Sequence, residues 1–107
     1  MNVKQKYPYL EDPKYLNSKI QEALLYYELS EEITLEVLQK WINSTDNPIP
    51  FVSQVLKEAY FESEIEAAKL VDLLTRLWNV TPRRELGGLS PQQKLASVLY
   101  NQKNVEK

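Results

Sequence analysis

Residues 63–80, SEIEAAKLVDLLTRLWNV, decide the fold of this chain. Ser63 and Glu66 have the spacing of a capping box, in which each side chain bonds the other residue's free backbone N–H at the start of a helix. The apolar residues that follow recur every three or four positions, as on one face of a helix: Ile65, Ala68, Val71, Leu74, Leu77 and Trp78, widened by Ala67, Leu70 and Leu73. Because this apolar surface is so wide, we expect its helix to lie at the centre of the fold.

The first two helices are expected between residues 12 and 42. Asp12 and Pro13 are residue types favoured at an N-cap and a first helical position, and the helix that they begin should run to about Leu29. Ser30 is expected to cap the second helix, because two glutamates follow it and suit the positive end of a helix dipole. The expected buried residues are Leu16, Ile20, Ala23, Leu24 and Tyr27 in the first helix and Leu35, Leu38, Trp41 and Ile42 in the second.

Two further helices flank the central one. The turn formers of residues 43–48, NSTDNP, break the chain, and a helix should begin around Pro50. The last helix should start after Ser90, where Pro91 and Gln93 fit a first helical position and a second capping box. The residues expected to face inward are Val52, Val55, Leu56, Ala59 and Tyr60 in the earlier helix and Leu95, Val98 and Leu99 in the last one.

The composition agrees with one globular domain. The chain has 107 residues, of which 43% are hydrophobic and 26% charged. We therefore expect an all-α fold, a compact bundle of about five helices in a single domain over residues 1–107, with an N-terminal arm at 1–11 and a frayed tail at 102–107. No apolar run approaches the roughly 20 residues that cross a bilayer, and the N-terminus lacks a signal-peptide core, so a cytoplasmic location is expected.

The chain contains no His and no Cys, which removes much catalytic chemistry. A Ser-His-Asp triad, a Cys nucleophile and a zinc site with His or Cys ligands are all impossible within it. Carboxylates remain, and five of them could approach a hard metal ion or could simply solvate helix exteriors: Glu58, Glu62, Glu64, Glu66 and Asp72. Since no calcium-binding loop pattern surrounds them, we expect no enzyme activity, no cofactor and no metal site.

Residues 81–91, TPRRELGGLSP, combine both glycines with the chain's pair of adjacent arginines. Such a connection could form a small basic site for phosphate or carboxylate beside the start of the last helix, with an aromatic anchor for a protein partner. The candidate binding residues are Trp78, Arg83, Arg84 and Lys94. The alternative is that Trp78, Leu86 and Leu89 pin the connection to the core while one arginine pairs with the acidic middle of the chain, residues 21–75.

The charges are distributed unevenly along the chain. Residues 21–75 hold three Lys and eleven acidic residues, a net charge of −8, whereas residues 1–20 carry +2 and residues 76–107 carry +4. Such a distribution favours self-association or a charged protein partner, unless the charges only solvate helix exteriors. Leftover apolar surface would allow a homodimer.

Nucleic acid is the alternative partner. The last helix offers polar and basic residues of the kinds that contact DNA or RNA: Gln92, Gln93, Lys94, Asn101, Gln102 and Lys103. The net charge of −2 disfavours this reading. We therefore expect a non-catalytic protein-interaction or accessory module, and keep as the alternative a small DNA- or RNA-binding regulator that uses this helix with Arg83 and Arg84.

Residues 78–91 also resemble a known segment. Uncharacterised bacterial proteins, mostly from Gram-positive organisms and sometimes near a SecC-type zinc-binding motif, contain a WNxTPRxELxGxxP segment. The matching residues are Trp78, Asn79, Thr81, Pro82, Arg83, Glu85, Leu86, Gly88 and Pro91, with Ser90 similar. This chain departs from the pattern at Arg84 and Gly87, and it lacks the cysteines of the zinc motif. The resemblance implies a bacterial helical domain of unknown activity and carries over no catalytic residue.

Overall fold

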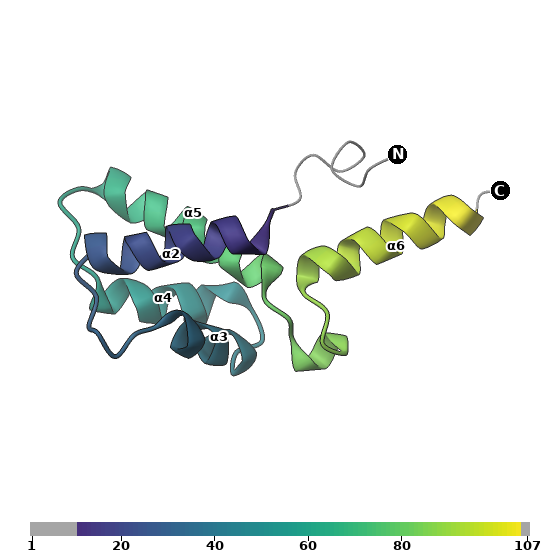
Figure 1. The fold of residues 1–107 in the computed structure, drawn as a ribbon, viewed down its shortest axis with the longest axis horizontal. Coiled ribbons are helices and arrows are strands. Elements are labelled where there is room, and N and C mark those ends of the chain that lie inside the picture. Colours follow the sequence, from purple (N-terminus) through teal and green to yellow (C-terminus); the bar gives the residue numbers. More distant parts are fainter. Residues whose placement is uncertain (1–10, 106–107) are drawn as a thin grey trace.

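The computed structural model describes residues 11–105, and these residues form five α-helices and one short 3-10 helix. The elements are α2 (Pro13–Tyr26), α3 (Leu35–Asn43), α4 (Pro48–Glu58), α5 (Glu64–Val80), η1 (Arg84–Leu86) and α6 (Pro91–Val105). No residue of this described part lies in a strand, which confirms the predicted all-α bundle. Helices α2 to α5 form a body, and α6 projects from one end of it (Figure 1).

The predicted arm and tail lie mostly outside the described residues. Of the arm expected over residues 1–11, the structure describes Glu11 alone, and Glu11 is hydrogen-bonded to other parts of the fold. Helix α6 continues to Val105, past the point near Gln102 where fraying was expected.

Helix α5 lies at the centre of the body, as predicted. It packs against α2, α4 and α6, and its Ser63 cap accepts a hydrogen bond from the Glu66 N–H at 3.3 Å. The core is built from fully buried side chains of all four body helices: Leu16 and Ile20 in α2, Leu38 and Ile42 in α3, Phe51 and Val55 in α4, and Leu70, Leu74 and Leu77 in α5. Burial of this apolar surface is the main force that holds the body together.

The predicted start of the second helix is wrong. Helix α3 begins at Leu35, and its N-cap is Thr34, whose hydroxyl accepts a hydrogen bond from the Val37 N–H. Ser30 instead accepts from the Glu32 N–H within a turn. The turn is favoured because it lets Leu29 and Ile33, on either side of Ser30, both reach the core, and their burial outweighs a local capping signal.

The predicted inward face of α4 is wrong at two positions. Tyr60 is exposed because the helix ends at Glu58, so Tyr60 no longer follows its periodicity. Phe51, which the pattern omitted, is fully buried, with its ring centroid 6.1 Å from that of Trp78. The helix begins at Pro48 under an Asn47 cap, slightly before the expected start at Pro50.

Candidate functional site

Arg83 is a buried residue at the junction of α3, α5 and the connection to α6. It is only 4% exposed, and its guanidinium donates to the backbone carbonyls of Ile42 and Thr45, each at 2.6 Å. Its Nε and Nη2 donate to the Glu85 carboxylate, and the group stacks over the Trp78 ring. In place of the expected external anion, Arg83 therefore binds carbonyl oxygens at the C-terminal end of α3 and a neighbouring carboxylate.

The connection around Arg83 is closed by backbone hydrogen bonds. The Arg83 N–H donates to the Leu89 carbonyl at 3.0 Å, and the Arg83 carbonyl accepts from the Gly88 N–H at 2.9 Å. Gly87 and Gly88 have φ values of 68° and 86°, which glycine adopts without the steric cost that a Cβ would bring. Asn43 ties this segment to α3, since its amide donates to the Pro82 carbonyl and accepts from the Arg84 N–H.

The four candidate binding residues therefore separate into two pairs. Trp78 and Arg83 are buried against each other, which corresponds to the alternative in which the connection is pinned to the core and one arginine pairs with an acid. Arg84 and Lys94 are exposed. Arg84 lines a shallow groove together with Lys40 and Glu36 of α3, so charges of both signs meet at this surface.

The start of α6 is fixed by a double capping box. The Ser90 hydroxyl accepts from the Gln93 backbone N–H at 3.1 Å, and the Gln93 side-chain Oε1 accepts from the Ser90 backbone N–H at 2.9 Å. This is the reciprocal pair that the sequence predicted. It orients the first turn of α6 relative to the buried connection.

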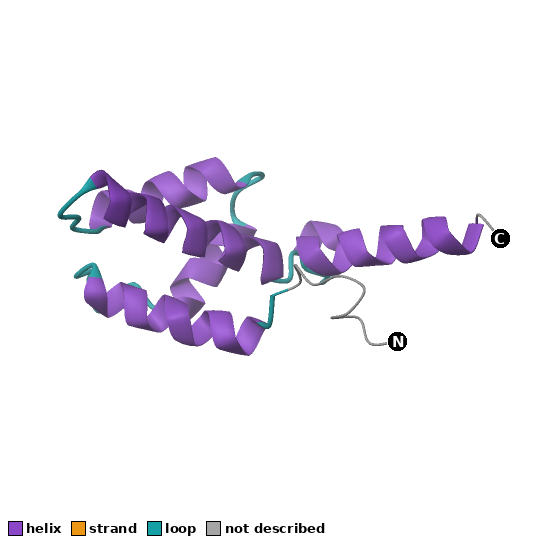
Figure 2. Ribbon diagram, turned by 90° about the horizontal axis from the view of Figure 1, so that it is seen from above, coloured by secondary structure: helices purple, strands orange, loops and turns teal. Residues whose placement is uncertain are grey.

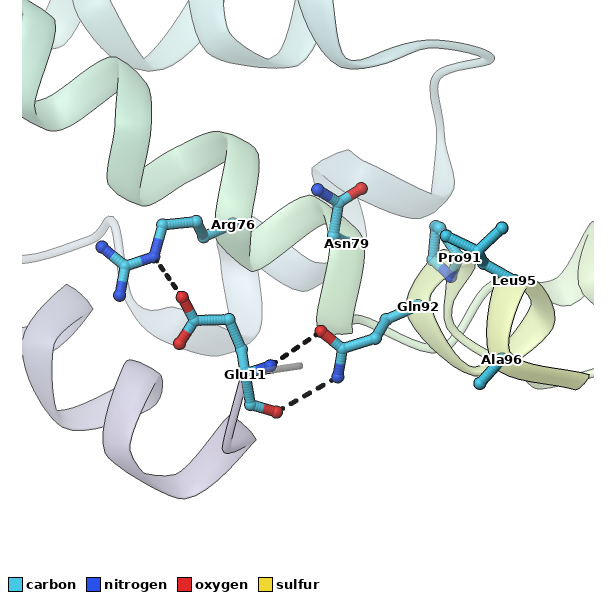
Figure 3. Close-up of a pocket in the computed structure, with 7 residues that line it drawn as sticks. All are labelled: Glu11, Arg76, Asn79, Pro91, Gln92, Leu95 and Ala96. Carbon is cyan, nitrogen blue, oxygen red and sulfur yellow. Dashed lines mark hydrogen bonds and ion pairs between the residues drawn. The ribbon is translucent and has the colours of Figure 1, made fainter. Parts of the chain in front are cut away.

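A second contact anchors the same turn to the beginning of α2. The Gln92 side chain accepts from the Glu11 N–H at 2.9 Å and donates to the Glu11 carbonyl at 3.1 Å (Figure 3). The Glu11 carboxylate accepts from Arg76 Nε of α5 at 2.6 Å, and this hydrogen bond raises the pKa of Arg76. These groups border a cleft of about 310 Å³ that Leu95 and Ala96 also line, so α6 leaves the body from a rigid base.

The apolar face of α6 is left uncovered by the other residues that the structure describes. Leu95 is 51% exposed and Val98 is 41% exposed, so the prediction that both face inward is wrong. The reason is geometric, since α6 packs mainly on α5 and extends away from the other helices (Figure 2). Helical periodicity identified the apolar side of α6 but could not tell which surface would cover it.

The sequence also raised the five carboxylates as weak candidates for a metal site, and it offered no segment for crossing a membrane. Across residues 11–105, no three acidic residues lie together in a way that could hold a metal ion, so the five carboxylates singled out above do not converge. Within the same range, no helix combines the length and the apolar character needed to cross a membrane.

No protein-family model, curated protein or solved structure matches this chain. The likeness of residues 78–91 to a bacterial segment therefore stays a prediction. The structure gives that segment a physical role, because its tryptophan and first arginine form the buried contact between Trp78 and Arg83.

Proposed function

We propose that this chain is a non-catalytic protein-interaction module, located in the cytoplasm, and that α6 docks against α6 of a second copy. The observation that carries this proposal is the uncovered apolar stripe of Leu95 and Val98 on a helix whose base is held rigidly. An isolated helix of 15 residues is marginal in water, and an amphipathic helix gains most of its stability by burying its apolar face. A partner that covers the stripe supplies that stability.

The charges of α6 suit a second copy as the partner. The sequence of α6 contains two charged residues, Lys94 and Lys103, among fifteen. Two such helices meet with little electrostatic repulsion, since exposed charge pairs contribute about 1 kcal/mol or less. A two-fold pair also places the same surface of each copy against the other, so one apolar stripe serves both sides of the interface.

Sedimentation equilibrium of the full chain tests this proposal. We expect wild type to dimerise reversibly and Leu95→Asp/Val98→Asp to be monomeric, with a cooperative thermal transition showing that the α2–α5 body is still folded and with some loss of helical circular dichroism from α6. Ile49→Asp is the matched control, because Ile49 is an exposed apolar residue on α4. A monomeric wild type, or a dimer that survives in the double variant, would overturn the role of α6. Co-purification of nucleic acid with wild type would instead support the DNA- or RNA-binding alternative.

A further inference from the structure

We propose that the end of the body opposite α6 is a second docking site, which binds an arginine or lysine of a basic, leucine-containing segment in a partner protein. The site comprises Leu25, Tyr26 and Glu28 from the end of α2, Tyr60 and Glu62 from the α4–α5 connection, and Glu66 from the first turns of α5. It lies where α2 ends and α5 begins, whereas α6 leaves from the other end (Figure 1). We call it the aromatic-acidic site.

The end of α2 has an unusual residue at a position that favours glycine. The Leu29 N–H donates to the Leu24 carbonyl and the Glu28 N–H to the Leu25 carbonyl, which is the Schellman pattern of a helix C-terminus. This pattern puts Glu28 in the left-handed region, with φ of 55°. Glycine is the usual residue there because it has no Cβ. A glutamate at this position costs stability, and it sets a carboxylate at the edge of the site.

Tyr27 joins the two segments that form the site. Its carbonyl accepts from the Tyr60 N–H at 2.9 Å, and its hydroxyl donates to Glu66 at 2.9 Å. Its buried ring packs edge-on against Tyr26, with centroids 4.9 Å apart, and lies 5.4 Å from Phe61. The aromatic-acidic site is therefore held in shape without a ligand, which lowers the entropic cost of binding one.

The exposed groups of the site suit a cation with apolar neighbours. Leu25 is 82% exposed and Tyr26 69% exposed, and they line the same hollow of about 420 Å³ as Tyr60. Glu28 and Glu62 line it too, and neither forms an ion pair with another residue that the structure describes. A guanidinium or ammonium group is attracted both to an aromatic face and to a carboxylate, and leucine would cover the apolar rim.

Charge complementarity extends beyond the hollow. The site belongs to residues 21–75, whose net charge is −8. A field of this sign attracts basic segments and repels acidic ones, and the attraction weakens as salt rises. A basic partner therefore fits this end of the body, while the uncharged apolar stripe of α6 fits the other interaction.

A peptide titration followed by NMR tests the site on the full chain. The probe is a nine-residue peptide with one arginine and one lysine flanked by leucines, and its control has glutamine in place of both basic residues. We expect the basic peptide alone to shift the amide signals of Tyr26, Glu28, Tyr60 and Glu62. Absence of binding at millimolar peptide, equal binding of the glutamine peptide, or shifts confined to other surfaces would overturn the proposal.

Two pairs of variants of equal net charge separate the site from general acidity. Glu28→Gln/Glu62→Gln should weaken binding of the basic peptide by about fivefold, the size expected for two exposed ion pairs. Glu31→Gln/Glu32→Gln should leave the affinity unchanged, since Glu31 and Glu32 are exposed but do not line the hollow. Equal losses in both pairs would mean that the peptide responds only to net charge. Tyr26→Ser should also weaken binding of the basic peptide. Full affinity in this variant would mean that the Tyr26 ring does not contribute to binding.

Discussion

The guanidinium of Arg83 lies over the indole of Trp78, with 4.2 Å between Cζ and the ring centroid. Because the same guanidinium bonds the Ile42 and Thr45 carbonyls, one side chain connects the end of α3, the end of α5 and the connection to α6. The pair of adjacent arginines, Arg83 and Arg84, thus contains one residue that holds the fold together and one that faces solvent.

Arg83→Ala should destabilise the fold. It removes hydrogen bonds from a charged group and leaves carbonyl oxygens without their donor, a loss of about 2–4 kcal/mol. For a domain of this size, we expect the melting temperature to fall by about 10 °C or more. Arg83→Lys should recover only part of this, because an ammonium cannot bond two carbonyls and a carboxylate in one plane or stack on indole in the same way.

Arg84→Ala is the matched control for Arg83. Arg84 is exposed, and its hydrogen bond to Asn43 uses the backbone N–H, which alanine retains. Its melting temperature should stay within about 2 °C of wild type, the usual range for a surface substitution. Similar losses in the two alanine variants by differential scanning calorimetry would contradict the role given to Arg83.

Tyr27→Phe should make the fold less sensitive to acid. The hydrogen bond from Tyr27, followed by that from Lys69, holds the pKa of Glu66 below its ordinary value. The resulting stability is fully present above the ordinary glutamate pKa of about 4.3, and it is lost as pH falls through the lower folded-state pKa. We expect the gap between wild type and Tyr27→Phe in urea unfolding to shrink from pH 7 to pH 3. Tyr26→Phe, at an exposed tyrosine, should show no such pH-dependent gap.

Alkaline pH should also weaken the contact between Tyr27 and Glu66, because it removes the tyrosine proton. Burial, together with the hydrogen bond to Glu66, raises the pKa of Tyr27 to about 12. Stability from its neutral hydroxyl is fully present below the ordinary tyrosine pKa of about 10, and it is lost as pH rises through the folded-state value. Phenolate absorbance at alkaline pH should therefore lose its latest-titrating component in Tyr27→Phe. Loss of a component that titrates near pH 10 instead would show that Tyr27 is not shielded.

Glu28→Gly should stabilise the fold. Glycine adopts the observed φ of 55° freely, whereas a residue with a Cβ pays about 1 kcal/mol in the left-handed region. We expect the melting temperature to rise by about 5 °C. Glu31→Gly, at a residue without positive φ, should be neutral or destabilising through added freedom of the unfolded chain. A fall in stability for Glu28→Gly would mean that the carboxylate makes a favourable contact that outweighs the backbone cost.

The parts of the fold that follow from local chemistry could be predicted from the sequence. Asp12 and Ser63 cap their helices, and Ser90 with Gln93 forms the full capping box, because these bonds join residues within one turn. The central position of α5 could also be predicted from the sequence, since so wide an apolar surface must be covered by several neighbouring helices.

The candidate site depended on contacts that local patterns do not encode. A charged residue in a connection is usually exposed, so nothing in the neighbourhood of Arg83 predicted that its partners would be carbonyls about 40 positions earlier. The aromatic-acidic site could not be predicted from the sequence either. The sequence showed Tyr26 beside Tyr27 and a set of acidic residues, but their meeting depends on the Tyr27–Tyr60 and Tyr27–Glu66 bonds between segments far apart in the chain.

The proposed pairing of α6 with a second copy can be tested most directly by crosslinking at the centre of the helix. Val98 is the middle residue of Pro91–Val105, so a two-fold pair centred on it brings each Val98 against its counterpart whether the helices run parallel or antiparallel. Because the chain contains no cysteine, Val98→Cys introduces a unique thiol, and Ile49→Cys provides an equally unique control on exposed α4. Mild oxidation at low micromolar protein should convert Val98→Cys to a disulfide-linked dimer while Ile49→Cys stays monomeric. Equal crosslinking of the two variants, or none at Val98→Cys, would contradict the pairing of α6 with a second copy.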